Sequence, residues 1–163
     1  MKQLIIAGAI LTTITMSALA QTLPSPRSLS EQLVGSWVSS SVTDVYEDGH
    51  VANSWGPDVK AAINFDGKGH YILTIIGAGL YPSQPMETPP RAKRPVVITF
   101  GTYSVDDAAS TVTYTADRAS DPILETARTA SMKLNDNELE QTSAPVKGPQ
   151  GTFRPHYVWK RAH

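Results

Sequence analysis

Arg128 is the residue whose position most clearly points to chemistry. Residues 124–134 alternate between two faces, and the mostly apolar face carries Leu124, Thr126, Arg128, Ala130, Met132 and Leu134. Such alternation is typical of a strand with one buried face, so Arg128 is predicted to point into a core. A buried guanidinium needs a partner, because an unpaired charge is strongly disfavoured away from water. That partner is either another group of the protein or a ligand with an anionic or carbonyl oxygen.

Two tyrosines are predicted to share the interior with Arg128. Tyr114 and Tyr157 occupy inward positions of other strand-like stretches, and a buried phenol needs a hydrogen-bond partner. The apolar residues predicted to point inward are Ile63, Phe65, Leu73, Ile75, Ile98, Phe100 and Val112. Small residues at Ala61, Ala116 and Ala130 would leave room among them. An apolar pocket with a few polar anchors is typical of small-molecule sites. We therefore expect a ligand-binding cavity formed by Arg128, Tyr114, Tyr157, Met132, Leu73 and Phe100.

No motif of a known catalytic or metal site is visible. The histidines never fall at a short metal-ligand spacing, and the chain has no cysteine. Gly77-Ala78-Gly79 begins like a dinucleotide-binding loop, but no strand–helix unit surrounds it. We therefore expect no metal ion and no cofactor, and we assign no catalytic residue. His70 and His156 could still converge in the fold, which keeps an enzyme open as the alternative.

The elements that position these side chains are predicted to be strands. Asp66-Gly67-Lys68-Gly69 between two apolar runs is the clearest hairpin signal. The strand-like stretches are 37–46, 51–55, 60–65, 70–76, 95–105, 110–116, 124–134, 138–143 and 151–161. Tight turns between most of them, with no long helix, predict an all-β antiparallel meander of eight to nine strands, either a sandwich or a barrel.

The N-terminal part is predicted to be a leader followed by one helical turn. Residues 1–20 combine a lysine, an apolar stretch and the small residues Ala18 and Ala20, which favours a signal peptide cut after Ala20 over a membrane anchor. The protein would then be periplasmic or secreted. Residues 21–32 form the rest of the leader and a short helix, whose capping box is Ser28 with Glu31. Leu29, Leu33 and Val34 would form its apolar face.

Charge and loop composition narrow the class of partner. Fourteen basic and 15 acidic residues give no basic stripe, so nucleic acid is not expected as a partner, and no membrane span is expected in the mature chain. Residues 77–94 form the one long connection, rich in proline and closed by the cations Arg91, Lys93 and Arg94. This segment is either a flap over a binding site or a solvated linker.

Several short motifs together resemble the bacterial lipocalin-like domain proteins of the calycin superfamily. They are Leu33-Val34-Gly35-Ser36-Trp37, Gly56-Pro57-Asp58, Ile63 to Gly69, Gly101 to Asp106, Arg128, and Val158-Trp159-Lys160-Arg161. The resemblance spans residues 33–161 and implies a single up-and-down barrel domain with an interior compartment. It also implies that Arg161 of the last strand lies over Trp37 of the first, beside Gly35, and closes the barrel floor.

Three functions remain open at this stage. The resemblance and the predicted pocket favour a carrier of a small hydrophobic molecule. The alternative is a small barrel enzyme, an isomerase, cyclase or hydrolase acting on an apolar metabolite, since fold alone does not fix function. A filled barrel that serves only as an interaction module is the third.

Overall fold

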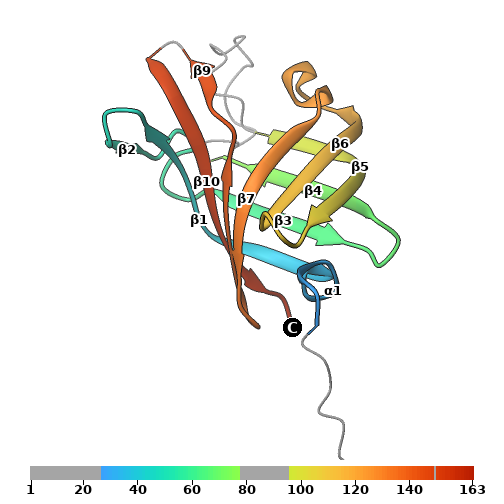
Figure 1. The fold of residues 1–163 in the computed structure, drawn as a ribbon. Coiled ribbons are helices and arrows are strands. Elements are labelled where there is room, and N and C mark those ends of the chain that lie inside the picture. Colours follow the sequence, from blue (N-terminus) through green and yellow to red (C-terminus); the bar gives the residue numbers. More distant parts are fainter. Residues whose placement is uncertain (1–26, 78–95, 149) are drawn as a thin grey trace, which may run out of the picture.

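The chain folds into a closed antiparallel β-barrel of eight strands with two extra strands and one short α-helix (Figure 1). The computed structural model describes residues 27–77, 96–148 and 150–163. The predicted signal peptide and nearly all of the proline-rich segment lie outside these residues. The described part contains no helix with the length and hydrophobicity that crossing a membrane requires.

The barrel is an up-and-down meander. Its elements are α1 (Leu29–Leu33), β1 (Gly35–Tyr46), β2 (Val51–Ala52), β3 (Lys60–Phe65), β4 (His70–Ile76), β5 (Val96–Asp106), β6 (Thr111–Ala119), the 3-10 helix η2 (Pro122–Glu125), β7 (Arg128–Leu134), β8 (Glu138–Ser143), β9 (Val146–Gly148) and β10 (Gly151–Arg161). The barrel strands β1, β3 to β8 and β10 each pair with their neighbours in this order, and β1 pairs with β10 to close the ring. Strands β2 and β9 flank that closing pair (Figure 1).

Most predicted strands are present with similar boundaries, but two are shorter than predicted and one strand was not predicted. The strand predicted over 51–55 is only Val51–Ala52, and it pairs with the end of β1 outside the barrel ring. The strand predicted over 124–134 begins at Arg128, because the amide of Leu124 bonds the carbonyl of Asp121 and closes a 3-10 turn. Strand β9 was not predicted.

Alternating side chains fill the interior. On β3 and β4 every second residue is buried, including Ile63, Phe65, Leu73 and Ile75, as expected for strands with one face in a core. The prediction that Ile98 and Phe100 point inward is wrong, since their side chains are 44% and 46% exposed. The residues of β5 that face the barrel interior are instead Val97, Thr99 and Gly101. Both faces of β5 carry apolar residues, so alternation identified two faces without showing which one is inside.

Two β-bulges adjust the path of the chain. The bulge between Ser39 and Ser41 reverses the alternation along β1, so Val42 and Asp44 share the interior with Trp37. The other lies in β5, between Phe100 and Gly101. A Cβ atom at Gly101 would lie 2.1 Å from the carbonyl oxygen of Thr115, so only glycine fits there.

The barrel floor is closed by the contact expected between the two ends of the domain. The guanidinium carbon of Arg161 lies 4.1 Å from the ring centroid of Trp37, which is fully buried. The indole nitrogen of Trp37 donates to the carbonyl of Leu33 at 2.9 Å. Gly35 makes room for this stack, because a Cβ atom there would lie 3.0 Å from Nη1 of Arg161. The floor therefore joins α1, β1 and β10 into one unit.

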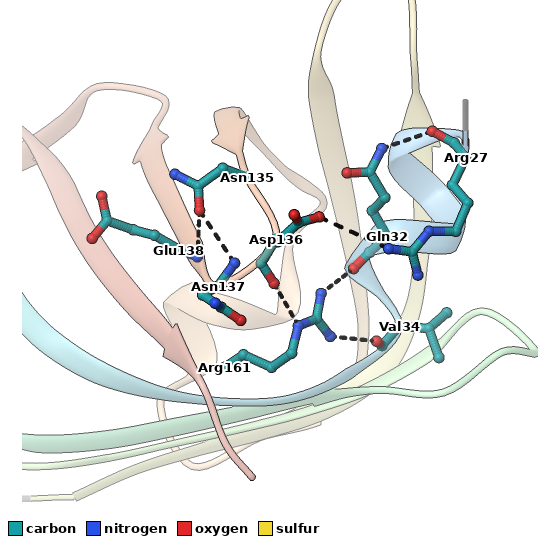
Figure 2. A network of polar contacts seen from close by, with 8 residues as sticks. All are labelled: Arg27, Gln32, Val34, Asn135, Asp136, Asn137, Glu138 and Arg161. Carbon is teal, nitrogen blue, oxygen red and sulfur yellow. Dashed lines mark hydrogen bonds and ion pairs between the residues drawn. The ribbon is translucent and has the colours of Figure 1, made fainter. Parts of the chain in front are cut away.

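Arg161 also satisfies backbone carbonyls of two other segments (Figure 2). Its Nη2 donates to the carbonyl of Gln32 at 2.6 Å and its Nη1 to that of Val34 at 3.0 Å, where α1 ends. Its Nε donates to the carbonyl of Asp136 in the β7–β8 turn at 2.9 Å. The last carbonyls of a helix lack partners within the helix, so Arg161 caps α1 against the barrel. The capping box of Ser28 and Glu31 at the other end of α1 is present as predicted, whereas Val34 lies after the helix and is partly exposed.

Replacement of Arg161 tests this closure. Arg161→Met removes three charge-assisted hydrogen bonds and the stack on Trp37, so the free energy of unfolding is expected to fall by about 3 kcal/mol in urea titrations. Arg161→Lys should recover part of the loss, because an ammonium cannot serve all three carbonyls. The control is Arg154→Met, at an exposed position of the same strand, which is expected to change stability by less than about 0.5 kcal/mol. Equal effects at both positions would contradict this role of Arg161.

Candidate functional site

A recess in the barrel interior brings together most of the residues predicted to bind a ligand. Its walls come from strands on opposite sides of the barrel, β3, β4, β6, β7, β8 and β10. The lining residues are Ile63, Leu73, Tyr114, Arg128, Thr129, Ala130, Gln141, Ser143, Tyr157 and Trp159. Apolar walls with a few polar groups are the composition of a small-molecule site.

The recess is narrow. It encloses about 390 Å³ of space between atoms, counted with its solvent-open side, but the centre of a water molecule can reach only about 20 Å³ of it. That is enough for about one water-sized group. Large side chains, including Trp37, Phe65 and Trp159, fill the rest of the interior. The recess therefore has room for about one small polar group but not for a whole organic molecule.

Arg128 lies at the start of β7, with part of its side chain in the recess. Its Cζ atom is 5.9 Å from the ring centroid of Tyr114, its direct cross-strand partner on β6. The Nε atom of Arg128 is buried and has no hydrogen-bond partner within the described part of the chain. Buried donors without partners are rare in folded proteins, so this N–H marks a place where an acceptor belongs. Among the described residues, no carboxylate forms an ion pair with Arg128.

Tyr114 belongs to a buried chain of hydrogen bonds. The indole nitrogen of Trp159 donates to Oε1 of Gln141 at 3.0 Å, and Nε2 of Gln141 donates to the hydroxyl of Tyr114 at 2.7 Å. Gln141 is only 3% exposed and both of its polar atoms are engaged. Burial raises the pKa of Tyr114, and the bond from Gln141 and the charge of Arg128 only partly oppose it. The phenol therefore stays protonated.

Tyr157 and Asp44 are two further ionisable residues near the recess. Burial raises the pKa of Tyr157 to about 12, with Arg128 acting to lower it and Asp44 acting to raise it. Asp44 is buried on β1, and burial raises its pKa while a hydrogen bond from the Ser54 side chain lowers it. Tyr157 and Asp44 occupy neighbouring inward positions on the closing pair of strands.

The other predicted residues are placed as follows. Leu73 lines the recess. Met132 is buried on the same face of β7 as Arg128, but it does not line the recess. Phe100 points outward, so it is removed from the candidate site. His70 and His156 do not converge, because they pair with Asp66 and Glu140, respectively. Within the described residues, no group of acidic or histidine side chains could hold a metal ion.

Polar residues of the interior that were not predicted include Gln141, Ser143 and Asp44. Gln141 and Ser143 follow the buried Leu139 at alternate positions of β8, so alternation along this strand could have identified them. Asp44 gave no such signal, because strict alternation from Trp37 places it outside. Only the bulge at Ser39–Ser41 turns it inward.

Comparison with models of known protein families finds no match to this chain, and comparison with curated proteins finds none either.

Alkaline pH should destabilise the barrel through its buried phenols. The pKa of Tyr157 rises from about 10 in the unfolded chain to about 12 in the barrel, so the neutral phenol stabilises the fold below about pH 10 and this contribution is lost as the pH rises through about 12. The free energy of unfolding, measured by urea titration from about pH 9 upward, is expected to fall less steeply in Tyr157→Phe than in the wild type. Identical slopes would show that the barrel does not raise the pKa of Tyr157.

Proposed function

We propose that this protein binds a small hydrophobic molecule in its barrel, with the polar end of the molecule against Arg128 and Tyr114. The observation that carries the proposal is the buried Nε of Arg128, which has no acceptor among the described residues. A ligand oxygen that enters the recess would satisfy this donor once the side chains packed around it move apart.

The walls of the recess favour an apolar ligand. Ile63, Leu73 and Ala130 supply apolar surface, and burial of such surface contributes about 25 cal/mol per Å². Because the ligand-free recess is narrow, binding of a longer chain requires the side chains around it to move apart. Tyr157, a bulky side chain that lines the recess, is partly exposed.

The resemblance to lipocalin-like domain proteins supports the same function. The closed barrel and the stack of Arg161 on Trp37 agree with what that resemblance implies. We propose on this basis that the chain is a lipocalin-like carrier, and from residues 1–20 that it is periplasmic or secreted.

The enzyme alternative has less support. Its acid–base chemistry would need a group that titrates near neutrality, and the two phenols of the recess have raised pKa values. The histidines His50, His70 and His156 pair with carboxylates and do not line the recess. No described residue of the recess therefore favours an enzyme over a carrier.

Binding of decanoate tests the role of Arg128. We expect the wild-type protein to bind decanoate in isothermal titration calorimetry and Arg128→Met to bind it at least about tenfold more weakly, because a charged hydrogen bond contributes about 1.5–3 kcal/mol. The control is Lys133→Met on the same strand, an exposed cation paired with Glu140 outside the recess. The control should leave the affinity unchanged. Failure of the wild type to bind, or equal losses in both variants, would contradict the proposal.

The proposed export has a direct test. When the full chain is expressed in a bacterium with a periplasm, the exported protein should begin at Gln21, because Ala18 and Ala20 fit the cleavage pattern. Intact mass measurement of the periplasmic fraction gives the N-terminus. Full-length protein retained in the membrane fraction would favour the membrane-anchor interpretation instead.

A further inference from the structure

The hydrogen-bond chain behind the recess has a fixed direction. The indole N–H of Trp159 can only donate, so the atom of Gln141 that faces it must be the amide oxygen. The NH₂ group of Gln141 is then directed at Tyr114, whichever way the amide is first drawn. The phenolic oxygen of Tyr114 is therefore the acceptor of this bond.

The hydroxyl proton of Tyr114 must consequently be directed at a different acceptor. It does not lie on the bond from Gln141, and the Tyr114 hydroxyl makes no other hydrogen bond within the described residues. Tyr114 lines the recess, as does Arg128, whose buried Nε–H also lacks an acceptor. Two residues that line the same recess thus each carry a donor without an acceptor among the described residues.

We infer that Trp159 and Gln141 orient Tyr114 as a hydrogen-bond donor into the recess, so that the site selects molecules whose polar end is an acceptor oxygen. The chemical class is a ketone, an ester or a carboxylate. Ammonium groups are disfavoured, because they have no acceptor atom and would meet donors and the positive charge of Arg128. This inference rests on the proposed function and specifies its ligand class.

Matched probes of similar size test the inference. Decanone offers an acceptor oxygen, whereas decyl chloride has nearly the same apolar body and only a weak acceptor. The wild type is expected to bind decanone about tenfold more tightly than decyl chloride, and Tyr114→Phe should remove most of this difference. In Gln141→Glu an ionised carboxylate would accept the proton of Tyr114, so the preference should fall although the phenol is retained. Tyr103→Phe, whose hydroxyl bonds the carbonyl of Asp66 away from the recess, is the control and should keep the preference.

A spectroscopic readout separates this role from a purely structural one. The carbonyl stretch of bound decanone should lie at lower frequency in the wild type than in Tyr114→Phe, because a donated hydrogen bond weakens the carbonyl bond. If the wild type binds decanone and decyl chloride equally, with no frequency difference, the inference is wrong and the proposed function stands. If it binds neither these probes nor decanoate, the proposed function fails and the inference with it.

Discussion

The barrel depends on one contact, the guanidinium of Arg161 stacked on the indole of Trp37. A sheet that curls into a ring must bring its first and last strands together, and here the side chain at the end of β10 also holds the end of α1 and the β7–β8 turn (Figure 2). Loop closure over such a long chain segment is entropically unfavourable, and both the β1–β10 ladder and this contact offset it where the ends meet. The recess lies above this floor and exists only because the ring is closed.

Within the ring, polar groups are organised by direction as well as by position. Trp159, Gln141 and Tyr114 form a chain in which each member has one permitted orientation, since it starts from a group that can only donate. Buried polar networks of this kind are costly when incomplete, and this one ends at the recess beside the unsatisfied Nε of Arg128. Trp159 and Gln141 thus have hydrogen-bond partners within the protein, whereas Nε of Arg128 has none among the described residues.

The fold could be predicted from the sequence because most of the signals for its strands and turns are local. The Asp66–Gly69 hairpin, the capping box at Ser28 and the period-two runs each act within a few residues, and the end motifs supplied the closure. The errors concern which face of a strand is buried, because this depends on the packing of the whole barrel. Ile98 and Phe100 were placed inside because β5 is apolar on both faces, and Asp44 was missed because a bulge changes which face is inside. Alternation shows that two faces exist, but packing against the remaining strands decides which one is buried.

Two of the three tryptophans are placed where their intrinsic fluorescence reports on the barrel. Trp159 lines the recess and donates a hydrogen bond from its indole N–H to Gln141, so its emission depends on the polarity and occupancy of that space. Trp37 is enclosed beneath a cation at the barrel floor, where its emission responds to whether the ring is shut. Filling and closure are consequently observable in solution without any attached dye.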